Sequence, residues 1–200
     1  MTSLVVVDSP KRWPLHIEGA TIVSSRDYLT GPGPLAEPGA KVFNLCRSYR
    51  YQSAGYYVSL LAEARGHRPL PAITAIQDLK LTPVVRLVSQ DLVELVQSSL
   101  HRIKSDEFEL SLYFGRNMAR QYDRLATALF NAFPAPMLRA RFERSDIWRM
   151  ASVRAIALGE VPESHRPFLA EQAARYLKRS PRKAKSGANI RFDLAILHDP

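Results

Sequence analysis

Charged and hydrogen-bonding side chains are concentrated in one short segment between an apolar run and an amphipathic run. These residues are Arg47, Tyr49, Arg50, Gln52 and Ser53. The planar guanidinium group of arginine suits two parallel hydrogen bonds to a carboxylate, and such charge-assisted bonds are about twice as strong as neutral ones. The first turn of a following helix would also offer unpaired N–H groups to an anion. The segment is therefore a candidate site for binding a carboxylate.

The same residues also have a purely structural interpretation. Ser53 could cap a helix, and Tyr49 could pack half-buried at the surface. Arg47 and Arg50 could form ion pairs with local carboxylates such as Asp78. The sequence leaves both interpretations open.

A second turn contains Arg116 and Asn117. Residues 108–114 alternate apolar and polar side chains, which predicts a strand with one polar face. Apolar positions at helical spacing follow the turn, and they predict a helix that Asn117 caps. If the strands before the two turns are parallel, their carboxyl ends face one crevice, and an acidic ligand would contact Arg47, Arg50 and Arg116 together.

The predicted strands that precede these turns alternate along the chain with predicted helices. This order predicts a mixed α/β protein, with helices packed on a central mixed sheet. In the helix from Ser53 to Gly66, the apolar stripe consists of Tyr57, Leu60, Leu61 and Ala64. Residues 31–39 predict a loop, and residues 72–76 predict an extended piece. The other predicted strands are 3–7, 21–24, 42–45, 137–143 and 147–156, and the other predicted helices are 84–87, 89–103, 117–133 and 163–178.

The net charge of +9 over 200 residues is unevenly distributed. Lysines and arginines between 178 and 185 supply more than half of it, beside Pro181 and Gly187. Such a run is typical of a solvated tether, and any phosphate contact would not be specific for sequence, so nucleic acid is not the expected partner. Residues 190–197 predict a new strand. We therefore expect one domain at 1–178, a basic linker at 179–189 and the start of a truncated second domain at 190–200.

Several classes of site are disfavoured by composition and motifs. Cys46 is the single cysteine, so an intrachain disulfide and a cysteine-based zinc site are excluded, and a buried thiol is favoured over a reactive one. The histidines have no metal-binding spacing, and the chain contains neither G-x-x-x-x-G-K-[ST] nor G-x-G-x-x-G. Apolar runs are too short to span a bilayer and the N-terminus does not resemble a signal peptide, so we expect no membrane partner and a cytoplasmic protein.

Four segments carry a resemblance that spans nearly the whole chain. They are KVFNLCRSYRYQSAGYYVSLLAEARGHRPLP from Lys41, IQDLKL from Ile76, LSLYFGRNMARQYDRLATALFNAFPAP from Leu110 and GEVPESHRPF from Gly159. Together they resemble the N-terminal domain of RimK-like ATP-grasp ligases. The closing RFDLAILHDP is similar to the first strand of the pre-ATP-grasp region in such proteins.

This resemblance implies an accessory α+β domain of an enzyme that uses ATP and magnesium. Such ligases phosphorylate a carboxylate, and an amine then attacks the acyl phosphate. The lysines and acidic metal ligands would lie beyond Pro200, so we assign no catalytic or cofactor-binding residue to this chain and do not expect it to be catalytic alone. We expect it to recognise an amino-acid or peptide substrate by its carboxylate, with the C-terminal ATP-grasp domain as its partner. The alternatives are a nucleic-acid- or ribosome-binding module and a purely structural or dimerising domain.

Overall fold

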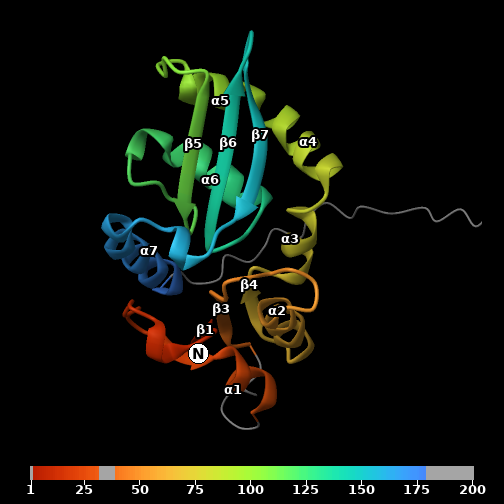
Figure 1. Ribbon diagram of the computed structural model, residues 1–200, viewed down its shortest axis with the longest axis vertical. Helices are drawn as coiled ribbons and strands as arrows, with labels where there is room; N and C mark the ends of the chain where they lie inside the picture. Colours follow the sequence, from red (N-terminus) through yellow and green to blue (C-terminus); the bar gives the residue numbers. More distant parts are fainter. Residues whose placement is uncertain (1, 32–38, 179–200) are drawn as a thin grey trace, which may run out of the picture.

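Residues 2–31 and 39–178 are described by a computed structural model, in which the strands are divided between two sheets (Figure 1). The predicted α/β class is confirmed, and the strands form one parallel and one antiparallel sheet where the sequence suggested one mixed sheet. The predicted linker at 179–189 and the predicted second domain at 190–200 lie outside the described residues, as does most of the predicted loop at 31–39.

The parallel sheet has the strand order β2-β1-β3-β4. Its strands are β1 (Ser3–Val7), β2 (Thr21–Ser24), β3 (Lys41–Asn44) and β4 (Arg68–Leu70). The two central strands, β1 and β3, are buried almost throughout, as continuous apolar runs of parallel sheets usually are. On one face, Leu4, Val6 and Val42 pack with residues of α1 (Ser25–Thr30) and α2 (Ala54–Ala64).

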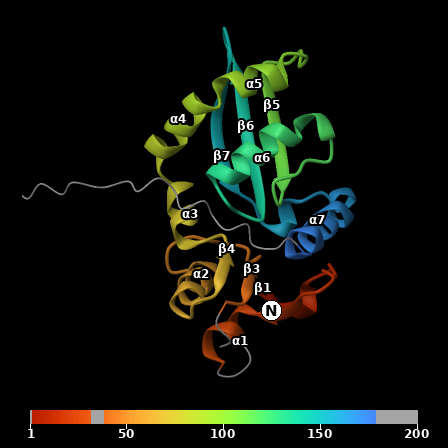
Figure 2. The ribbon, with the colours of Figure 1, turned by 180° about the vertical axis from the view of Figure 1, so that it is seen from behind.

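The antiparallel sheet has the order β5-β6-β7, from β5 (Glu107–Tyr113), β6 (Met137–Arg144) and β7 (Trp148–Ala155). Figure 1 views the face that no helix of the described residues crosses, and Figure 2 shows α5 (Val93–Leu100) and α6 (Asp123–Ala132) over the opposite face. Side chains alternate between buried and exposed along β6, which is the pattern of a sheet with one solvated face. By contrast, the central strands of the parallel sheet are buried on both faces.

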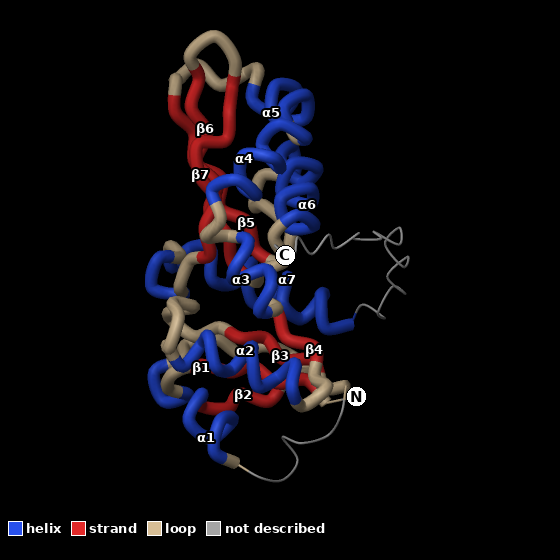
Figure 3. The backbone as a smooth tube through the Cα atoms, turned by 90° about the vertical axis from the view of Figure 1, so that its right-hand side faces the viewer, coloured by secondary structure: helices blue, strands red, loops and turns tan. Residues whose placement is uncertain are grey.

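The two sheets lie at opposite ends of the molecule and share one hydrophobic core (Figure 3). Phe43 of β3 packs on Phe114, at the end of β5, with ring centroids 4.9 Å apart. Tyr176 of α7 (Arg166–Lys178) contacts both rings, at 5.7 and 5.6 Å. These three rings join the parallel sheet, the antiparallel sheet and α7.

Three local predictions are wrong. Residues 72–76, predicted as extended, lie almost wholly in α3 (Ile73–Asp78), and α4 (Thr82–Asp91) follows it. The helix expected from Asn117 begins at Asp123, after a single 3-10 turn at Arg120–Tyr122. In α2, Tyr57 and Leu60 are 41% and 42% exposed, whereas the small residues on the opposite side of the helix face the core. Small side chains at these positions let the helix approach the sheet closely, so bulk alone did not identify the buried face.

The remaining described elements are single 3-10 turns, at Pro10–Arg12 (η1), Leu158–Glu160 (η4) and Glu163–His165 (η5).

Candidate functional site

The loop between β3 and α2 lies at the carboxyl edge of the parallel sheet. The chain leaves β1 for β2 on one side and leaves β3 for β4 on the other, so the boundary between β1 and β3 is the switch point of the sheet. Ligands of open α/β sheets bind in the crevice outside such a point. Asp8 follows β1 there, and Arg47 follows β3, which is the placement that the sequence predicted for the first arginine turn.

Tyr49 and Ser53 hold this loop in place. The Ser53 hydroxyl caps α2 by accepting a hydrogen bond from the N–H of Tyr56 at 3.3 Å, as the structural interpretation suggested, and it donates to the carbonyl of Ser48 at 2.9 Å. The Tyr49 hydroxyl donates to the carbonyl of Asn44 at 2.5 Å, and burial raises the pKa of Tyr49. A Cβ atom on Gly55 would lie 2.3 Å from the Ser48 oxygen, so the loop packs directly on the first turn of α2. The side chains of Tyr49 and Ser53 are therefore both used in contacts that hold the loop in place.

The arginines of this turn differ in how far they are neutralised. Arg47 pairs with Asp8 (Nε to Oδ2, 3.4 Å) instead of the suggested Asp78, and its backbone N–H also binds Asp8 Oδ2 at 2.8 Å. The Arg47 side chain is nevertheless 81% exposed. Arg50 and Gln52 are exposed, and within residues 2–31 and 39–178 their side chains make no hydrogen bond or ion pair. Binding of a ligand by this turn stays a prediction.

The second arginine turn does not lie at the same sheet edge. β3 belongs to the parallel sheet and β5 to the antiparallel one, so the condition for a crevice shared by both turns is not met. Asn117 bridges its own turn, donating to the carbonyl of Ser111 at 2.6 Å and accepting from the N–H of Ala119 at 2.8 Å. Arg116 pairs with Asp123 at 3.0 Å.

Arg116 and Asn117 line a pocket of about 450 Å³ between residues 114–123 and α7, which we call the α7 pocket. Its other lining residues are Phe114, Met118, Arg120, Asp123, Phe168, Glu171, Gln172, Arg175 and Tyr176. The pocket contains none of residues 47–53, and the sequence did not indicate that α7 contributes to it. Only folding brings α7 beside the Arg116 turn.

The charges of the α7 pocket are only partly compensated. Arg175 pairs with Glu171 at 2.6 Å, as Arg116 does with Asp123. Arg120 is exposed and has no ion pair in the described part of the chain. Gln172 is only 7% exposed, yet its side chain has no hydrogen-bond partner among the described residues. The amide atoms of Gln172 are not among the buried side-chain atoms that lack a partner, so they reach the solvent of the pocket, which Arg120 also lines.

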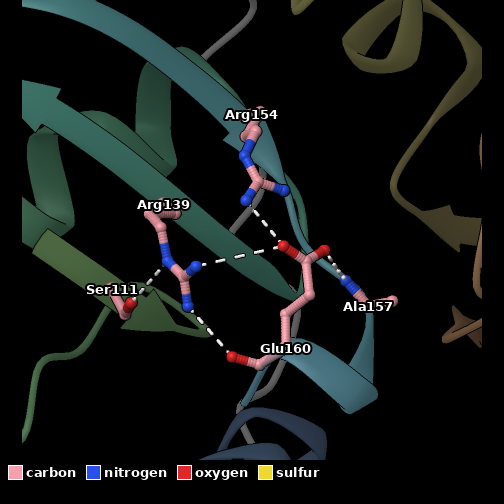
Figure 4. A network of polar contacts seen from close by, with 5 residues as sticks. All are labelled: Ser111, Arg139, Arg154, Ala157 and Glu160. Carbon is pink, nitrogen blue, oxygen red and sulfur yellow. Dashed lines mark hydrogen bonds and ion pairs between the residues drawn. The ribbon is translucent and has the colours of Figure 1, made fainter. Parts of the chain in front are cut away.

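A further arginine cluster lies on the open face of the antiparallel sheet (Figure 4). Arg154 of β7 binds Glu160 at 2.6 Å, and Arg139 of β6 donates to the Glu160 carbonyl at 3.0 Å and to the Ser111 hydroxyl at 3.2 Å. The hydrogen bond from Arg154 lowers the pKa of Glu160. This cluster connects β5, β6, β7 and η4, and the carboxylate of Glu160 lies within ion-pair distance of both arginines, so the cluster anchors η4 on the sheet. Alternation in β6 signals the outward position of Arg139, but nothing local signals the partner Glu160.

Cys46 lies close to the Arg47 turn and is buried, with 1% of its surface exposed. Burial, together with the negative charge of Asp8, raises the pKa of its thiol to about 12. The thiol therefore packs as a small apolar group, and the reactive-thiol interpretation is disfavoured.

Residues 2–31 and 39–178 contain no group of three or more histidine, cysteine or acidic side chains arranged to hold a metal ion. Among these same residues, no helix combines the length and apolar character that crossing a bilayer requires.

Comparison with known proteins identifies one family. The family model described as RimK-like ATPgrasp N-terminal domain matches residues 25–172, from the start of α1 into α7, so the match covers both arginine turns and the α7 pocket up to Gln172. No curated protein matches the chain.

Proposed function

The chain belongs to the family of RimK-like ATP-grasp N-terminal domains, and from this premise we propose that it recognises the carboxylate of an amino-acid or peptide substrate for a RimK-like ligase. The observation that supports this role is the α7 pocket, which is lined by Arg120, an arginine with no ion pair among the described residues, and by the side-chain amide of Gln172. An unpaired arginine that lines a pocket can bind a carboxylate with two hydrogen bonds.

The mixture of charges in the α7 pocket suits an amino acid or peptide better than a simple anion. Arg116, Arg120 and Arg175 outnumber Asp123 and Glu171, so the lining carries one net positive charge. Arg120 would bind the substrate carboxylate, while the two acidic side chains face any ammonium group. Gln172 can both donate to and accept from a peptide group.

In this proposal the chain contributes binding, and bond formation belongs to the C-terminal ATP-grasp domain of such a ligase, its proposed partner. ATP and magnesium would bind there, as the resemblance to ATP-grasp ligases implies. The product would be an amino-acid or peptide modification formed through an acyl phosphate. Since ATP is consumed, we place the reaction in the cytoplasm.

The proposal is tested by calorimetric titration of the 200-residue chain with alanyl-alanine and with its C-terminal amide. We expect the free acid to bind and the amide to bind much more weakly. Arg120→Gln should weaken binding of the acid by about 1.5–3 kcal/mol, the range for a hydrogen bond to a charged group. Arg124→Gln is the matched control, since Arg124 is exposed on α6 and does not line the pocket.

Equal affinities for acid and amide, or an Arg120→Gln variant with unchanged affinity, would contradict carboxylate recognition in the α7 pocket. Binding of a single-stranded RNA oligonucleotide that weakens steeply with salt, without dipeptide binding, would instead support the nucleic-acid alternative. A single carboxylate contact predicts only a shallow dependence on salt.

A further inference from the structure

A groove of about 470 Å³ runs between α4, α5 and β7, and we call it the β7 groove. Five consecutive residues of the β6–β7 hairpin line it, from Ile147 to Ala151. Successive side chains of a strand point to opposite faces of a sheet, so a groove that meets every residue of a stretch follows the edge of the strand. The β7 groove therefore exposes the edge of β7 to a ligand.

β7 is an outer strand that pairs only with β6 among the described residues. At Trp148 the open edge is already used, because the side-chain amide of Gln97 on α5 accepts from the Trp148 N–H at 3.1 Å and donates to its carbonyl at 2.6 Å. Gln97 thus pairs with the strand edge as a neighbouring strand would. These contacts also establish which way the backbone groups of β7 point.

Backbone groups of an antiparallel strand point alternately to one neighbour and to the other. Trp148 lies opposite Arg144 and Met150 lies opposite Phe142, in a register that is unbroken between them. The N–H and carbonyl of Met150 therefore point to the same edge as those of Trp148, into the groove beyond Gln97. An unpaired strand edge of this kind is a template for another strand.

The side chains around this edge favour an acidic, partly apolar ligand. Val85, Val93 and Ile147 line the groove, and Ile147 is 38% exposed. Arg86 and Arg149 also line it, no acidic residue does, and neither arginine has an ion pair within the described ranges. By contrast, Arg141, Arg144 and Arg154 of the same hairpin are all paired with carboxylates.

We propose that the β7 groove binds an extended acidic segment of another protein as an additional strand beside β7. The segment pairs its backbone with Met150, places alternate apolar side chains against Val85 and Val93, and directs carboxylates to Arg86 and Arg149. A second copy of the chain fits less well, because pairing of two β7 edges would bring the arginines of both strands together. This site is separate from the α7 pocket, and neither proposal depends on the other.

Fluorescence anisotropy with a labelled peptide of alternating glutamate and valine tests the proposal, and a lysine–valine peptide is the charge-reversed comparison. We expect the glutamate peptide to bind and the lysine peptide not to bind. Arg86→Gln and Arg149→Gln should each weaken binding about tenfold, as loss of one hydrogen bond between charged groups predicts. Arg124→Gln is again the control and should bind unchanged, and circular dichroism verifies that each variant is folded.

Amide hydrogen exchange followed by NMR separates strand addition from simple charge attraction. The glutamate peptide should slow exchange of the Met150 amide, and the same peptide methylated on its backbone nitrogens should neither bind nor protect it. Binding without protection of Met150, or binding that both arginine variants retain, would overturn the proposal. So would Met150 protection that rises with protein concentration in the absence of peptide, because the occupant would then be a second copy.

Discussion

Arginine side chains are present in each candidate site of this chain. Arginines close together in the sequence differ in whether their guanidinium group is already paired with a carboxylate. Arg47 and Arg116 are each paired with a carboxylate, Asp8 and Asp123. Nearby in the chain, Arg50 and Arg120 have no ion pair among the described residues. A paired guanidinium must exchange its partner to bind a ligand, so the unpaired arginines are the better candidates for binding.

The Arg154–Glu160 contact leads to a prediction about acid stability. The hydrogen bond from Arg154 holds the pKa of Glu160 below its usual 4.5. A carboxyl group whose pKa is lower in the folded state stabilises the fold above its unfolded pKa, and this contribution is lost as the pH falls through the folded pKa. Glu160→Gln should therefore lower stability near neutral pH, by about 0.2–1 kcal/mol because the pair is exposed.

Calorimetric melting of both proteins across the acidic range measures this effect. The difference in melting temperature between wild type and Glu160→Gln should shrink as the pH falls from 4.5 through the lower pKa of Glu160 in the folded protein, since this carboxyl group is then protonated and uncharged, as glutamine is. Asp146→Asn in the β6–β7 hairpin provides a control, because Asp146 is exposed and makes no ion pair within the described residues. A difference that stayed constant into strong acid would mean that the Glu160 carboxylate is not stabilising.

Among the elements, α2 shows how close packing and buried polar contacts orient a helix. Asn44 of β3 donates to the Gly55 carbonyl at 2.6 Å and to the Ser59 hydroxyl at 2.9 Å. Ser59 in turn donates to the carbonyl of Pro71 at 2.7 Å. These buried contacts turn the small, polar side of α2 inward and leave Tyr57 and Leu60 partly exposed. The close packing of Gly55 on Ser48 also positions the loop that carries Arg47 and Arg50.

Gly55→Ala should destabilise the protein although alanine is the better helix former. The propensity gain is about 1 kcal/mol. The added Cβ would lie 2.3 Å from the Ser48 oxygen and 2.9 Å from the Cys46 Cβ, so backbone must move. We expect the clash to outweigh the propensity and to lower the free energy of unfolding in urea by about 1–3 kcal/mol. Gly159→Ala, which meets nothing within 4 Å, should be nearly neutral. Equal stability of the two variants would contradict the close packing at Gly55.

At the scale of the whole molecule, the shared core predicts that the two sheets unfold together. Phe43, Phe114 and Tyr176 connect them, and the buried cluster that includes these phenylalanines extends across both. A tryptophan reports on each end, since Trp148 begins β7 and Trp13 precedes β2.

In the Trp13→Phe variant, fluorescence follows Trp148, and in the Trp148→Phe variant it follows Trp13. For each variant, the fluorescence transition in urea should coincide with the transition in far-ultraviolet circular dichroism, as two-state unfolding requires. Comparing two probes within one variant removes the effect of the substitution itself. A fluorescence midpoint separated from the circular dichroism midpoint would show that the sheets unfold as independent units.

The sequence by itself determined the features that depend on neighbouring residues. Apolar alternation located β5 and the β6–β7 hairpin, continuous apolar runs located β1 and β3, and a serine before a helical pattern identified the cap at Ser53. Four segments sufficed to indicate the family whose model matches residues 25–172. Such patterns can be recognised in the sequence because a strand or a helix end is specified within a few residues.

Only the tertiary structure decided which strands share a sheet, which arginines are neutralised and which segments form a pocket. Arg47 meets Asp8 from 39 positions away, and the Arg116 turn meets Gln172 and Arg175 only because α7 packs beside it. The edge of β7 lies open because β7 is the outer strand in the order β5-β6-β7. Contacts between distant segments depend on how the whole core packs, and no local pattern of side chains specifies them.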